Sequence, residues 1–178
     1  MVEALASAEG KAEIVHGRLI QLPMTGEDPH FAAQEITFAL RAFARHRGVG
    51  RAAGDSLGFL VDLPQRMSFA PDAAYYVLRP SGMRFVEGAP QFAVEVRSEN
   101  DYGPAAEREM AAKRADYFAA GTLVVWDVDL LSSDVVRVFR DGDAEAPAAV
   151  FRRGATADAE PAVPGWTMPI DNLFAPGT

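Results

Sequence analysis

The sequence predicts an α+β (α/β) fold, in which a mixed β-sheet is flanked by α-helices. Two observations support this expectation. Short apolar runs typical of strands outnumber the segments with helical spacing, and they occur before, between and after the two helical segments. The predicted order is β–β–α–β–β–β–β–α–β–β. The 178 residues suit one domain, residues 12–174, preceded by a flexible N-terminus of residues 1–11.

The chain is expected to begin with an N-terminal β-hairpin. Its strands are Glu13–His16 and Arg18–Leu22, because a glycine, Gly17, between two short apolar runs favours a tight turn. The first helix, Phe31–Arg45, follows, since its apolar residues recur at helical spacing and Gly48 ends it. Three short strands are expected next: Gly50–Ala53, Gly58–Leu63 and Ala73–Leu78.

The second half of the chain contains the central strand and the second helix. Strand Gln91–Arg97 alternates, so Glu95 and Arg97 point to the same face. The second helix spans Pro104–Ala120, with its proline in the first turn and Gly121 after its end. Two strands and a tail follow: Leu123–Val128, Val135–Phe139 and Trp166–Phe174. Residues 80–90 and 144–164 are expected to be loops, the second with one edge strand.

Composition excludes several classes of function. The chain has 17 Lys and Arg against 25 Asp and Glu, a net charge of −8, which argues against general coating of nucleic acid and against binding to anionic membranes. A small basic groove remains compatible with this charge. Without cysteine, disulfides, cysteine-ligated metals and cysteine nucleophiles are excluded. No apolar stretch reaches ~20 residues and residues 1–11 do not resemble a signal peptide, so we expect a cytoplasmic protein.

Two charged residues stand where the pattern favours apolar side chains. Glu95 lies in the middle of a strand, where a buried carboxylate needs a partner or a metal ion. Alternatively, its face of the strand is open to water. Lys113 lies at the centre of the apolar face of the second helix, where its ammonium needs carboxylates or a phosphate. Alternatively, its stem lies along the edge of the core and its ammonium reaches water.

Asp72 provides a second carboxylate. It follows Pro71 just before a predicted strand, although Pro-Asp is also a common turn dipeptide. Together, Asp72, Glu95 and Lys113 could hold a magnesium ion and orient a water molecule, because Mg²⁺ prefers oxygen ligands and keeps several waters. Such an ion lowers the pKa of bound water and stabilises charge on a phosphate.

Three segments around these residues resemble a known family. They are Phe69–Tyr75, Phe92–Ser98 with Asp101, and Lys113–Tyr117 leading to Gly121. In this order and spacing they resemble the Uma-type putative restriction endonucleases, a family of the PD-(D/E)XK nuclease superfamily. The similarity extends over roughly Ala12–Phe174. It implies a restriction-endonuclease-like domain with its site at one end of the central strands.

The resemblance also implies a reaction: Mg²⁺-dependent hydrolysis of DNA phosphodiester bonds by a metal-activated water, with Mn²⁺ able to substitute. Asp72, Glu95 and the backbone carbonyl of Val96 would be the metal ligands. Lys113, on the helix after the acidic strand, would orient the water.

Two further residues each have two possible roles. Arg97 stands where the superfamily's basic pattern has lysine, and it would bind phosphate or form an ion pair with a nearby acid. Glu35, at the border of the first helix's apolar stripe, would be an accessory ligand or hydrogen-bond partner, or else a solvated helix residue.

The sequence leaves other functions open. Residues 98–101 read Ser-Glu-Asn-Asp where the family usually has Ser-Pro-Ser-Asp, which adds negative charge near a site for DNA. A catalytically inactive nuclease fold that binds or regulates a partner is therefore one alternative. A phosphodiesterase acting on RNA or nucleotides is another. The apolar C-terminal tail is compatible with a homodimer.

Overall fold

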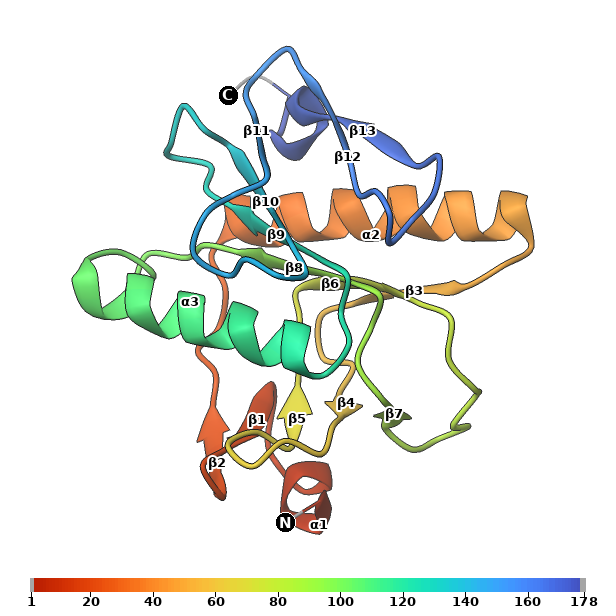
Figure 1. Ribbon diagram of the computed structural model, residues 1–178, viewed down its shortest axis with the longest axis vertical. Helices are drawn as coiled ribbons and strands as arrows, with labels where there is room; N and C mark the ends of the chain where they lie inside the picture. The colour runs from red at the N-terminus through yellow and green to blue at the C-terminus, as the bar shows by residue number, and fades with distance from the viewer. Residues whose placement is uncertain (1, 177–178) are drawn as a thin grey trace.

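A six-stranded mixed sheet forms the centre of the computed structural model, which describes residues 2–176 (Figure 1). Its strands are β3 (Arg51–Gly54), β6 (Ala73–Tyr76), β8 (Phe92–Val96), β9 (Val124–Val128), β10 (Val136–Arg140) and β11 (Ala149–Phe151). They lie in the order β11-β10-β9-β8-β6-β3. β8 and β9 are parallel and the other neighbours are antiparallel. The predicted mixed sheet is confirmed.

One long helix covers each face of this sheet (Figure 1). Helix α2 (Glu27–Arg47) lies against one face, and helix α3 (Pro104–Ala119) lies against the other. The buried side chains of Ile36 and Leu40 hold α2 in the larger hydrophobic cluster. Tyr117 anchors α3 in a second cluster. The two helices therefore meet different sets of side chains from the same strands.

Strand β8 shows this division most clearly. Phe92, Val94 and Val96 belong to the cluster that contains the α2 residues, whereas Ala93 belongs to the cluster of Tyr117. Alternation of side chains along a strand then places Glu95 on the α3 face, together with Ala93.

The N-terminal segment lies beside α3 and below the sheet in Figure 1. It contains α1 (Val2–Ala6) and the predicted hairpin, β1 (Ala12–Val15) with β2 (Arg18–Gln21). A small three-stranded sheet adjoins it, formed by β4 (Phe59–Leu60), β5 (Ser68–Phe69) and β7 (Val86–Glu87). Residues 1–11 were expected to be flexible. In their described part, Leu5 of α1 is buried in a cluster with residues of β1, while Met1 lies outside the described residues.

Several boundaries differ from those predicted. Helix α2 begins at Glu27 rather than Phe31, since Pro29 is compatible with the first turn of a helix. The expected loop 80–90 contains β7, and two-residue strands are too short to give a periodic signal. The C-terminal third contains an additional pair, β12 (Thr156–Asp158) with β13 (Thr167–Pro169), followed by the 3₁₀ helix η1 (Ile170–Leu173). Within the described part of the chain, none of the helices has the length and apolar character needed to cross a bilayer.

Candidate active site

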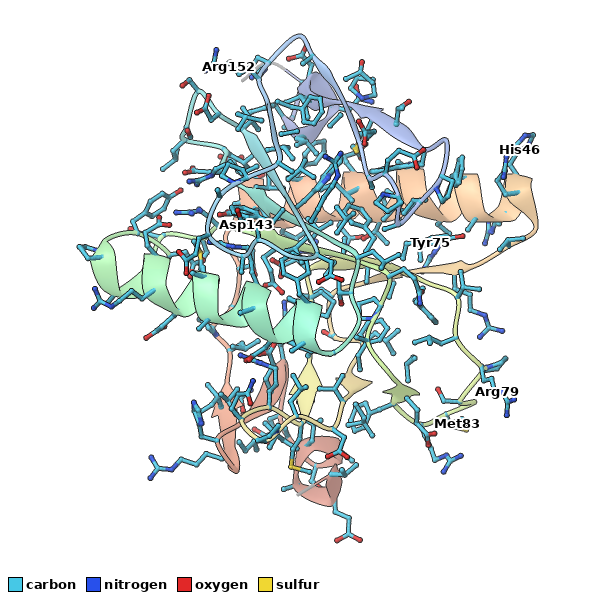
Figure 2. All side chains as sticks on the ribbon, viewed as in Figure 1. His46, Tyr75, Arg79, Met83, Asp143 and Arg152 are labelled. Carbon is cyan, nitrogen blue, oxygen red and sulfur yellow. The ribbon has the colours of Figure 1, made fainter. Side chains whose placement is uncertain are left out.

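A pocket of about 580 Å³ opens between the N-terminal hairpin, the central strands and α3. Its lining includes five of the residues predicted from the sequence: Asp72, Glu95, Val96, Arg97 and Lys113. It also includes residues that the sequence did not indicate, above all Lys11 and Glu13. Arg79 and Met83, on the loop between β6 and β7, lie well away from α3 (Figure 2). The charged side chains that line the pocket thus come from segments that are far apart in the chain.

Asp72 lies directly before β6 and faces the end of β8. Its backbone amide donates a hydrogen bond to the carbonyl of Val94 over 3.0 Å. Its carboxylate oxygen Oδ2 accepts a hydrogen bond of 2.7 Å from the amide of Val96, and Oδ1 lies 2.5 Å from Nζ of Lys11. Asp72 thus joins two central strands and presents a carboxylate to the pocket.

Glu95 is held by two partners from α3. Its Oε1 accepts a hydrogen bond of 2.6 Å from the hydroxyl of Tyr117 and lies 2.9 Å from Nζ of Lys113. Burial raises the pKa of Glu95; Lys113 opposes this rise, and the nearby carboxylate of Asp72 adds to it. A cation placed between Asp72 and Glu95 would favour the ionised form of Glu95. The carboxylate is therefore partnered rather than simply exposed, in line with the first of the two sequence readings.

Lys113 lies one helical turn before Tyr117, so both side chains leave α3 on the same face. Its Nζ lies 2.9 Å from Oε1 of Glu95 and 3.0 Å from Oε1 of Glu13. Burial lowers the pKa of Lys113, but the carboxylates of Glu13 and Glu95 outweigh this effect and the net shift is upward. Beside these two carboxylates, the ammonium is therefore protonated at neutral pH and can act as a hydrogen-bond donor.

Glu13 is a site residue that the sequence did not reveal. Its side chain is buried: Oε1 accepts a hydrogen bond from the amide of Ala70, and Oε2 lies 2.5 Å from Nη1 of Arg66. Arg66 in turn contacts Asp116 of α3 over 2.8 Å. Burial raises the pKa of Glu13, yet Lys113 and Arg66 outweigh it and lower the value overall. In a hairpin strand, a glutamate between two apolar residues normally points to solvent. The sequence pattern therefore did not predict that Glu13 is buried.

Lys11 is the second unpredicted residue, and it comes from the segment expected to be flexible. Its Nζ lies 2.5 Å from Asp72 Oδ1 and 2.9 Å from Asp55 Oδ1, and its side chain is 12% exposed. Burial lowers the pKa of Lys11, but Asp72 and Glu95 raise it further than burial lowers it. A positive charge therefore already lies beside the two candidate ligands.

Arg97 forms the ion pair that was the alternative to phosphate binding. Nε and Nη2 donate to Asp127 of β9, each over 2.8 Å. Nη1 and Nη2 also donate to Glu107 of α3, and Nη1 reaches the carbonyl of Asp101. All five N–H donors of the guanidinium thus have acceptors within the protein. Arg97 as it stands ties β8 to β9 and α3.

Glu35 is not brought to the pocket. It lies on α2, which covers the opposite face of the sheet from α3, and it is not among the pocket-lining residues. The other candidate residues line one pocket, and Glu35 lies outside it.

The donor set is compatible with a divalent cation. Within residues 2–176 there is no group of three or more His, Cys, Asp or Glu side chains arranged to hold a metal ion. Magnesium, however, commonly binds through one or two protein carboxylates, with waters and substrate phosphates as further ligands. Asp72 and Glu95 supply two such carboxylates, and the ammonium of Lys11 shows that a cation fits against Asp72.

Comparisons with known proteins agree with this fold. The crystal structure of a putative nuclease belonging to DUF820 from Anabaena variabilis ATCC 29413 is similar, with a TM-score of 0.74 and 17% sequence identity. The similarity covers 97% of this chain and 96% of that one. No curated protein matched the chain significantly. Residues 2–171 match the family model Uma2, described as putative restriction endonuclease. The chain therefore belongs to the Uma2 family.

Proposed function

We propose that this protein is a metal-dependent endonuclease that hydrolyses DNA phosphodiester bonds with Mg²⁺ or, in its place, Mn²⁺. One observation carries the proposal: a single pocket collects Asp72, Glu95 and Lys113 from three separate elements. Membership of a restriction endonuclease family supports a nuclease reaction. We further propose that residues 12–174 act as one domain, because one hydrophobic cluster joins α2, the sheet and the C-terminal strands.

In this proposal, Asp72, Glu95 and the backbone carbonyl of Val96 hold the metal ion. When bound, the ion supplies an activated water and neutralises charge on the phosphate. Tyr117 fixes the carboxylate of Glu95 through its hydroxyl. The protein thereby positions the acidic ligands before any substrate arrives.

Lys113 contributes positive charge to the reacting phosphate. Glu95 and Glu13 account for two of its three N–H donors, and no further acceptor is found for it within residues 2–176. The third donor can bind the attacking water or a phosphate oxygen. The buried pair of Glu13 and Arg66 keeps the lysine in place. Arg97 would contact phosphate only after Glu107, whose side chain is 46% exposed, releases it.

The test is cleavage by purified protein in Mg²⁺ or Mn²⁺. The substrates are a supercoiled plasmid, a single-stranded DNA and an RNA of the same sequence. We expect the wild type to cut DNA. We expect Asp72→Asn, Glu95→Gln and Lys113→Met each to lower the rate by about 10²-fold or more, because each removes charge from the reacting centre.

The matched control is Glu87→Gln, which makes the same acid-to-amide change at an exposed position of β7. It should cut as the wild type does. DNA cleavage at full rate by Asp72→Asn would contradict the site assignment. Cleavage of RNA alone would instead support the RNA alternative, and no cleavage of any substrate would support an inactive binding module.

A further inference from the structure

Lys11 occupies the position of a cation at the candidate metal site. Its Nζ contacts Oδ1 of Asp72 at 2.5 Å, while Oδ2 of the same carboxylate accepts the amide of Val96 at 2.7 Å. Both oxygens of Asp72 are therefore engaged by groups of the protein itself. A divalent ion cannot approach Oδ1 while the ammonium remains there, because the two positive charges repel each other at short range.

The backbone of Lys11 is held in place, so release concerns the side chain alone. The carbonyl of Lys11 accepts a hydrogen bond of 2.9 Å from the amide of Leu22, which directly follows β2. Beyond Asp72, the ammonium has a second carboxylate, Asp55, at 2.9 Å; that side chain is 31% exposed. Lys11 can therefore leave Asp72 and keep one ionic partner nearer to water.

We propose that Lys11 is an internal competitor for the metal ion, which neutralises Asp72 until a divalent cation displaces it. The inference rests on the proposed function in one respect, the assignment of Asp72 as a metal ligand. Without Lys11, the mostly buried carboxylates of Asp72 and Glu95 would face each other with less compensating charge. The lysine therefore stabilises the metal-free pocket and, for the same reason, weakens metal binding.

Calorimetric titration with Mn²⁺, without nucleic acid, tests this competition. Lys11→Met removes the ammonium and retains an unbranched side chain. We expect it to bind Mn²⁺ about tenfold more tightly than the wild type, since the ion no longer has to break a mostly buried ion pair. Lys11→Arg, which keeps the charge, should bind like the wild type. Arg41→Met, an equal charge change at an exposed position of α2, should have no effect.

Thermal unfolding gives a second readout. In the absence of metal, Lys11→Met should melt below the wild type, because Asp72 and Asp55 lose their common partner. Saturating Mn²⁺ should raise its melting temperature more than that of the wild type. If Lys11→Met does not fold, Lys11→Gln removes the charge but keeps a hydrogen-bond donor, and it should also bind Mn²⁺ more tightly than the wild type.

The outcomes separate this inference from the proposed function. If folded Lys11→Met and Lys11→Gln bind Mn²⁺ no more tightly than the wild type, while Asp72→Asn/Glu95→Gln loses binding, the competition is overturned and the metal site stands. Two results would overturn both the competition and the proposed metal site. One is that neither the wild type nor any Lys11 variant binds Mn²⁺, and the other is that Asp72→Asn/Glu95→Gln binds it as tightly as the wild type.

Discussion

The two faces of the central sheet differ in what they bury. On the α2 face, the ring of Trp126 lies 5.2 Å from that of Phe92 and 5.3 Å from that of Trp166, within an apolar cluster. On the α3 face, Lys113 lies between the carboxylates of Glu95 and Glu13. The same strand, β8, contributes to both faces.

This contrast separates the face whose burial favours folding from the face whose burial opposes it. Burial of apolar rings is favourable by itself. Burial of charged groups costs desolvation, which ion pairs offset only in part, and apolar replacements of similar volume are often as stable. Stability alone therefore does not account for the charged face. The proposed binding of a cation and an anionic phosphate would account for it, because both need fixed charges shielded from water.

The largest loss of stability is expected on the apolar face. Trp126→Ala should lower the free energy of unfolding by about 3–5 kcal/mol, because it leaves a cavity where a fully buried ring stood. Urea denaturation measures the change. Leu131→Ala, at a side chain that is 84% exposed, should change stability by less than about 0.5 kcal/mol. Comparable effects at the two positions would contradict the core described above.

A smaller loss of stability is expected on the charged face when a substitution keeps the positive charge but cannot make the same hydrogen bonds. Arg66→Lys should cost roughly 1.5–3 kcal/mol, because one ammonium cannot reproduce the contacts of Arg66 with both Glu13 and Asp116. The matched control is Arg152→Lys. Arg152 lies at the surface of the molecule (Figure 2), where it pairs with Asp134, and its side chain is 69% exposed. This change should cost less than about 0.5 kcal/mol. Equal losses would mean that the buried network contributes no more than a surface pair.

The smallest effect is a change in acid sensitivity. The pKa of Glu13 is lower in the folded protein than its ordinary value of 4.5, so below that value the unfolded chain takes up the proton more readily. The stabilisation from ionised Glu13 is therefore present above about pH 4.5 and lost as the pH falls through the folded-state pKa. Glu13→Gln should be less stable than the wild type at pH 7, and the gap should narrow in acid. A gap that stays constant from pH 7 into acid, measured by urea denaturation at each pH, would contradict this role.

The sequence predicted the parts of the site that depend on local patterns. Lys113 was found from the apolar face of its helix, and Glu95 from the alternation of its strand. Lys11 and Glu13 were missed because their partners lie 61 and 53 residues away in the chain, in Asp72 and Arg66. The periodicity of neighbouring residues cannot predict contacts between residues so far apart in the sequence.

Arg97 and Glu35 illustrate the same limit. The direction of Arg97 could be predicted from strand alternation, but its saturation by Asp127 and Glu107 depends on how β9 and α3 pack. For Glu35, the helical stripe predicted a position near the core without saying which face of the sheet the helix covers. Long amphipathic elements were therefore predictable, whereas contacts made across the sheet were not.

The most direct test of the account is Mn²⁺ binding by calorimetry in the absence of nucleic acid. It compares the wild type with Asp72→Asn/Glu95→Gln and with the matched double variant Asp62→Asn/Glu87→Gln, whose two carboxylates are exposed. Circular dichroism confirms that all three are folded. We expect the wild type and the matched variant to bind the ion equally and Asp72→Asn/Glu95→Gln not to bind it. Binding of equal affinity by all three proteins would show that Asp72 and Glu95 are not the metal site.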